Sequence, residues 1–154
     1  MYTPEEIDYE ISDTSIVPEY ARGPFARALS YLPEDVVDFV IENCVFISLD
    51  KSDNGVQIGI NDFRLKNKRD IIFLSEMLWF KNKKAIAFVV AHEVAHAYKK
   101  HEMKDLIKDT DIALNQKREK DADKQATIWL RPHFTGSLKR YMYKDWQLRI
   151  DNNQ

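Results

Sequence analysis

Two histidines and a glutamate lie close together in the sequence His92-Glu93-Val94-Ala95-His96. This sequence falls inside an apolar run from Ile86 to Tyr98 without Gly or Pro, which predicts a helix rather than a strand. Residues four apart lie on one face of a helix, so His92 and His96 can bind one metal ion between their imidazoles. Glu93 can then act on a water molecule at that metal without binding the metal itself. The pattern therefore predicts a zinc site with a general base beside it.

A catalytic zinc ion usually takes three protein ligands and a water, so one ligand is missing from this pair of histidines. His101 follows His96 by five residues, about 140° around a helix, and should point elsewhere. Glu119 is the best remaining candidate, on a helix predicted over roughly residues 115–131. Asp123 follows Glu119 by one helical turn and can accept the other ring N–H of a zinc-bound histidine, which would fix its tautomer.

Two segments together resemble the gluzincin pattern of zinc metallopeptidases. His92-Glu93-Val94-Ala95-His96 matches H-E-x-x-H, and Glu119-Lys120-Asp121-Ala122-Asp123 matches E-x-x-A-D on a second helix. Length and strand order are similar to the minimal gluzincins of the ImmA/IrrE-type and SprT-like groups over about residues 44–131. The chain lacks the C-terminal cysteine set of a SprT-like zinc ribbon and an obvious helix-turn-helix segment.

The resemblance implies a zinc metallopeptidase that hydrolyses peptide bonds in a peptide or protein substrate. His92, His96 and Glu119 would bind one zinc ion. Glu93 would be the general base, and Asp123 would lie outside the ligands, toward His92. The strand at residues 71–76 would pair with an extended substrate. The oxyanion formed during hydrolysis needs a further donor, for which the candidates are His133, Tyr141 and Tyr143, with His133 the one we single out.

Other functions fit parts of the same pattern. A binding or regulatory module could keep the zincin fold and cleave little, and turnover of unfolded proteins would distinguish it from a peptidase. Peptide deformylases also carry H-E-x-x-H, but their cysteine ligand lies in a Gly-Cys-rich segment, which the surroundings of Cys44 do not match. A purely structural zinc site is disfavoured because such sites are usually closed by four Cys or His ligands.

The rest of the chain predicts an α+β domain with a zincin-like fold. Residues 1–23 are interrupted by Pro and Gly and predict an irregular N-terminal arm, followed by a single domain over residues 24–154. Helical spacing predicts one helix after Pro24 and a second that begins at Pro33.

Three segments predict the strands of the sheet. They are residues 44–50, 56–60 and 69–75, and Asn54-Gly55 is a hairpin signal between the first two. Short connections between consecutive strands favour a small antiparallel sheet, packed on the histidine helix and the glutamate-bearing helix.

Composition limits the remaining possibilities. The chain has 154 residues and a net charge of −2, which suits one domain and gives no electrostatic case for binding nucleic acid or an anionic membrane. Its apolar stretches are too short to span a membrane, and the N-terminus lacks a signal peptide's apolar region. The single cysteine, Cys44, excludes an internal disulfide and is expected to be buried. We expect a cytoplasmic protein, and the oligomeric state stays open.

Overall fold

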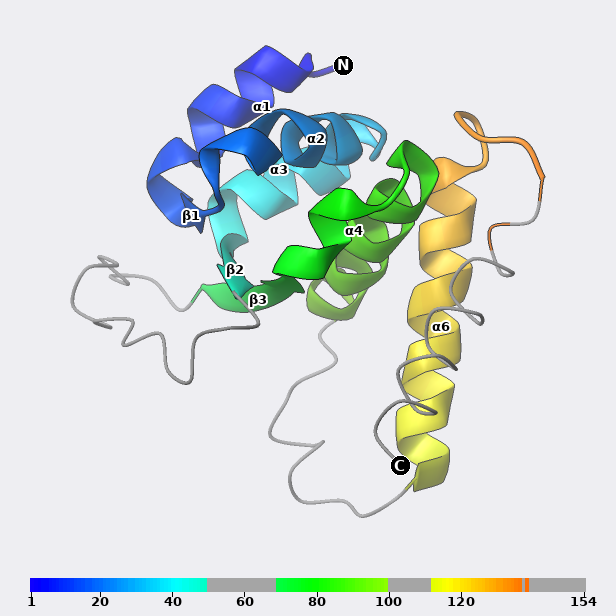
Figure 1. Ribbon diagram of the computed structural model, residues 1–154. Helices are drawn as coiled ribbons and strands as arrows, with labels where there is room; N and C mark the ends of the chain where they lie inside the picture. The colour runs from blue at the N-terminus through cyan, green and yellow to red at the C-terminus, as the bar shows by residue number, and fades with distance from the viewer. Residues whose placement is uncertain (50–68, 100–111, 137, 139–154) are drawn as a thin grey trace.

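The fold is α+β, as predicted. The computed structural model describes residues 1–49, 69–99, 112–136 and 138, with side chains described from residue 116 onward in the last helix. The helices are α1 (Pro4–Ile11), α2 (Glu19–Ser30), α3 (Glu34–Asn43), α4 (Lys83–Tyr98) and α6 (Ile112–Leu130). The strands are β1 (Ser15–Ile16), β2 (Cys44–Leu49) and β3 (Asp70–Ser75), and two short 3₁₀ helices are η1 (Ser12–Thr14) and η2 (Glu76–Phe80). Figure 1 shows α4 between α2 and α6, with the sheet at one end of the helical layer.

The N-terminal segment is not the irregular arm that the sequence predicts. The helix α1 begins with a capping box, in which the Thr3 side chain accepts from the Glu6 N–H and the Glu6 carboxylate accepts from the Thr3 N–H. Pro4 occupies the first turn, where its missing N–H costs nothing. Ile7 and Ile11 are fully buried or nearly so and attach α1 to the rest of the core. Thr3, Pro4 and Glu6 are the sequence signature of such a helix start, although the helix has only eight residues.

The second helix also differs from the prediction, since α2 begins at Glu19 and continues through Pro24. Proline removes one backbone hydrogen bond and normally clashes with the Cβ of the residue before it when that residue is helical. Gly23 has no Cβ, so the clash is absent at this position and the helix can continue. The buried face of α2 then contributes Ala21, Phe25, Ala28 and Leu29 to the core.

The sheet is parallel, and the prediction of an antiparallel sheet was wrong. The strand order is β1-β2-β3, and β2 pairs with β3 in a register that runs from Cys44 opposite Asp70 to Leu49 opposite Ser75. Parallel neighbours need a crossover of a dozen or more residues rather than a tight turn. The chain between Leu49 and Asp70 is long enough for such a crossover. The strand predicted at residues 56–60 lies outside the described residues.

The helix α4 is the centre of the core. Its N-terminus is capped by Asn82, whose side chain accepts the Ala85 N–H at 2.9 Å. It ends at Tyr98, as predicted. Nearly every apolar residue between is buried, because α2, β3 and α6 surround the helix. No helix in the described part of the chain is long and apolar enough to cross a membrane. Cys44 is fully buried, and its burial raises the pKa of the thiol to about 12.

Candidate metal centre

The helices α4 and α6 bring the predicted site residues together. Ala122 and Ala126 on α6 are fully buried, as is Ala95 on α4. Small side chains at these positions let the two helices pack closely, so that polar side chains next to them can reach across. The face of α6 that carries Ala122 and Ala126 therefore packs against α4.

Three potential ligands converge at this interface. The Nε2 atoms of His92 and His96 lie 3.1 Å apart. The Glu119 carboxylate places Oε2 3.1 Å from the Nε2 of His92 and Oε1 3.2 Å from the Nε2 of His96. His92 is buried, His96 has a side-chain exposure of 19%, and Glu119 is more open at 47%. The cluster is therefore held in the protein on one side and accessible on the other.

The spacing of these atoms fits a zinc ion. Zinc bonds to nitrogen and oxygen of about 2.0–2.1 Å place the ligands of a tetrahedral ion about 3.3 Å apart. The separations of 3.1–3.2 Å in the cluster are close to one face of such a tetrahedron. Three acceptor atoms that face one another also repel unless a cation lies among them. The residues present therefore fit a bound divalent metal, which would leave a fourth position open.

Asp123 sets the orientation of the first histidine. Its Oδ1 lies 2.8 Å from the Nδ1 of His92, on the side of the ring away from Glu119. A carboxylate at this distance favours the tautomer with the proton on Nδ1, since it can only accept. The Nε2 of a neutral His92 then carries a lone pair that points into the cluster. This is the state in which a histidine binds metal.

The electrostatics of the metal-free cluster favour a proton in place of the metal. Burial lowers the pKa of His92, but the hydrogen bonds to Asp123 and Glu119 outweigh it and raise the pKa to about 9. Hydrogen bonds from His92 and His96 hold the pKa of the Glu119 carboxyl far below its ordinary value. At neutral pH the metal-free protein therefore carries an imidazolium at His92 beside an ionised Glu119.

Metal binding should weaken as the pH falls, because a metal must displace the proton on His92. With a pKa of about 9, the apparent association constant for Zn²⁺ should rise with pH up to that value, by about tenfold per pH unit. Competition with a chelator of known pH dependence measures the association constant, and a constant that does not change with pH would contradict the assignment.

In the metal-free protein the protonated His92 stabilises the fold below its ordinary pKa of 6.5, and this stabilisation is lost as the pH rises through about 9.

Replacing Asp123 by Asn should reduce zinc affinity by roughly 10- to 100-fold. The amide oxygen of Asn can still accept the Nδ1–H of His92, but the negative charge that makes the ring a better donor to the metal is lost. Zinc titration of the purified variants gives the measurement, with Asp35→Asn on the exposed part of α3 as the matched control. An affinity equal to wild type would show that Asp123 only packs against the ring.

The remaining predicted residues lie in different parts of the fold. Glu93 is half-buried and follows His92 on α4. His133 is not brought to the cluster, because it lies beyond the opposite end of α6, where its ring is 5.1 Å from the ring of Tyr31. About 16 Å of helix rise separates Glu119 from Leu130, the end of α6. The other two oxyanion candidates, Tyr141 and Tyr143, lie outside the described residues, as does His101, which the helix spacing had set aside.

An ion pair beside the cluster was not predicted from the sequence. The Nζ of Lys99 lies 2.7 Å from the Oδ1 of Asp121, with side-chain exposures of 27% and 40%. Lys99 follows His92 by seven residues, which is two helical turns, and so lies on the same face of α4. Asp121 lies between Glu119 and Asp123 on α6. The pair joins the end of α4 to α6, and the two-turn spacing of Lys99 from His92 was the signal that could have revealed it.

Part of the chain matches a family of known proteins. Residues 81–150 match the model of the family described as Peptidase U49. No curated protein and no solved structure matches the chain. The matched range contains α4, α6 and every residue of the cluster. The match supports a protease, which acts on proteins or peptides.

Proposed function

We propose that this chain is a zinc-dependent metallopeptidase of gluzincin type. His92, His96 and Glu119 hold one zinc ion, and Glu93 is the general base. The observation that carries the proposal is the convergence of three ligand atoms at 3.1–3.2 Å within a segment that matches a peptidase family. The orientation of His92 by Asp123 supports it, because peptidase zinc sites commonly fix a histidine ligand in this way.

The chemistry divides between the metal and the chain. A zinc ion bound here would polarise the scissile carbonyl and lower the pKa of water. The Glu93 carboxylate accepts a proton from the attacking water and delivers it to the nitrogen of the leaving amine. Glu93 is half-buried, so its carboxylate stays accessible to the attacking water. Asp123 stays hydrogen-bonded to His92 and keeps its imidazole in one tautomer.

The edge of the sheet offers a place for the substrate backbone. Among the described strands, β3 lies at the end of the order β1-β2-β3 and leads through η2 into α4. Its side chains alternate, with Ile72 and Leu74 buried while Ile71 and Phe73 are 41% and 46% exposed. An extended peptide that adds to β3 would contact these two apolar side chains. The substrate is then an extended, unfolded segment with apolar residues.

Turnover of an unfolded protein tests the proposal. The zinc-loaded chain should release fragments from a panel of dye-labelled unfolded proteins, a chelator should stop the release, and added zinc should restore it. Mass spectrometry of the fragments would locate the cleaved bonds. Turnover that persists after the metal is removed would overturn the metal-dependent mechanism. Bound zinc without turnover on any substrate would instead favour a binding or regulatory module that retains the site.

A further inference from the structure

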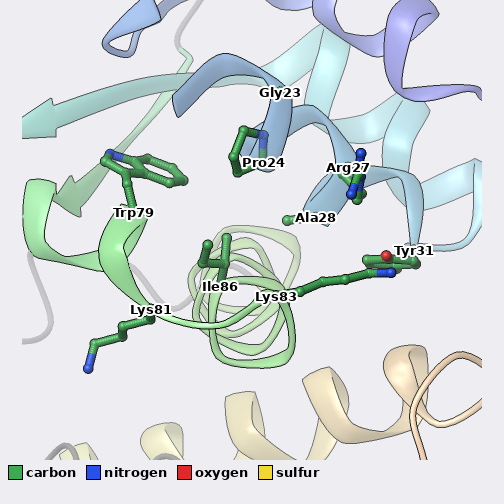
Figure 2. A pocket seen from close by; sticks show the side chains of 9 residues that line it. All are labelled: Gly23, Pro24, Arg27, Ala28, Tyr31, Trp79, Lys81, Lys83 and Ile86. Carbon is green, nitrogen blue, oxygen red and sulfur yellow. The ribbon is translucent and has the colours of Figure 1, made fainter. Parts of the chain in front are cut away.

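A hollow lies on a different side of α4 from the metal cluster. It has a volume of about 310 Å³, is open to solvent, and is lined by the second half of α2, by η2 with Lys81, and by the first turns of α4. The metal cluster lies between α4 and α6, whereas this hollow lies between α4 and α2 (Figure 2). About 9 Å of helix rise also separates Ile86, in the hollow, from His92. The volume is in the range of sites that bind small molecules.

The two ends of the hollow differ in chemistry. Figure 2 shows Trp79 at one end, with Pro24 and Ile86 next to it, and these side chains form an apolar wall. Arg27, Tyr31 and Lys83 gather at the other end. Arg27 and Tyr31 are one turn apart on α2, and the Nζ of Lys83 lies 5.5 Å from the centre of the Tyr31 ring.

The charge of the hollow is one-sided. Its lining contains Arg27, Lys81 and Lys83 and no carboxylate, and the Lys81 side chain points away from the other two (Figure 2). The chain as a whole has more acidic than basic residues, 25 against 23, so this imbalance is local. Arg27 and Lys83 are both exposed, and their side chains can turn toward a ligand without a large change in the fold. A guanidinium, an ammonium and a phenol hydroxyl together are donors suited to an anion.

We propose that this hollow is a binding site for a small organic anion whose charged group is attached to a flat apolar body. The anionic group lies between Arg27 and Lys83, with the Tyr31 hydroxyl as a further donor, and the flat body packs against Trp79 and Pro24. Such a group can belong to a free small molecule or to an acidic side chain next to an aromatic one in a peptide. The binding site does not depend on the metal cluster or on peptidase activity.

A charged and an uncharged probe of the same shape test the proposal. Benzenesulfonate is an anion at all working pH values and a poor metal ligand, and methyl phenyl sulfone is its neutral counterpart. Trp79 lines the hollow, so the ¹⁵N–¹H signal of its indole reports on binding there. The indole N–H donates to the Ser48 Oγ at 2.9 Å. Benzenesulfonate should shift this signal with a Kd of roughly 1 mM, and the sulfone should bind at least about tenfold more weakly. Added salt should weaken the binding of the anion alone.

Charge-removing variants identify the residues. Arg27→Gln and Lys83→Gln should each weaken benzenesulfonate binding by about tenfold, whereas Lys83→Arg should keep most of it. Lys124→Gln, on the exposed face of α6, is the matched control and should bind like wild type. Equal binding of the two probes, or an equal loss in the Lys124 variant, would overturn the proposal. So would the absence of any shift at Trp79.

Two blocked dipeptides test whether the anion can belong to a peptide. One contains phenylalanine and glutamate, and its neutral counterpart contains phenylalanine and glutamine. Preference for the glutamate form would extend the site to acidic peptide segments. If only benzenesulfonate binds, the site takes free small anions. If neither binds, the proposal is wrong.

Discussion

Glu93→Gln should abolish hydrolysis while the protein keeps its zinc. Gln has nearly the same shape as Glu, but its amide cannot accept a proton from water at neutral pH. General acid–base catalysis contributes roughly 10²- to 10⁴-fold to such reactions, and a loss of that size in kcat is expected here. Glu93 contributes none of the three ligand atoms of the cluster, so the zinc content should stay at the wild-type level. Turnover of a dye-labelled unfolded protein and elemental analysis of the same samples give the two measurements.

The control for this variant is Glu42→Gln, which removes a carboxylate from an exposed position of α3. It should leave both turnover and zinc unchanged. Full activity of the Glu93 variant would refute the role of general base. Loss of zinc together with activity would show instead that Glu93 helps to hold the cluster.

The geometry of the cluster follows from spacing that is visible in the sequence. His92 and His96 are one turn apart on α4, and Glu119 and Asp123 are one turn apart on α6. In the structure α6 runs antiparallel to α4, so Asp123 meets His92 and Glu119 reaches both histidines. Two helices that each carry such a pair bring the four side chains together when they run antiparallel and pack closely. The buried alanines at the interface supply the short contact distance.

The sheet could not be predicted in the same way, because strand pairing is not local. Cys44 pairs with Asp70 and Ser15 pairs with Phe46, and no local pattern specifies either partner. The antiparallel prediction assumed that consecutive strands are joined by tight turns, which is a statistical preference and not a physical requirement. The strand β1 has only two residues, too few for an alternating pattern to be recognised.

The position of His133 shows a different limit of sequence reasoning. By residue type, a histidine that closely follows the helix carrying Glu119 is a reasonable donor to an oxyanion. The helix α6 continues to Leu130 without interruption, so a residue beyond its end must lie far from Glu119. His133 instead packs on Tyr31, next to Lys83, which is near the hollow between α2 and α4. Helix length, which was predicted correctly to within a few residues, was enough to exclude it from the cluster.

Glu119→Ala should remove zinc from the protein. Two histidines would remain, and a catalytic zinc site normally needs a third protein ligand. The affinity should fall by more than the roughly 100-fold that is typical when a residue outside the ligands is lost. Elemental analysis of the purified wild type and variant measures the content, and a competing chelator measures the affinity. Zinc should also stop stabilising the variant, whereas at about 100 times the Kd it should stabilise the wild type by roughly 2.7 kcal/mol.

The matched control is Lys120→Ala, which changes the exposed neighbour of Glu119 on the same helix. It should keep both zinc and the zinc-dependent rise in Tm. Because Glu119 has a side-chain exposure of 47%, its truncation leaves the buried contacts of Ala122 and Ala126 in place, and the helical circular dichroism should be unchanged. A folded Glu119 variant with wild-type zinc would refute Glu119 as the third ligand. A variant that loses both zinc and turnover, while Glu93→Gln loses turnover alone, would separate the residue that holds the metal from the residue that moves the proton.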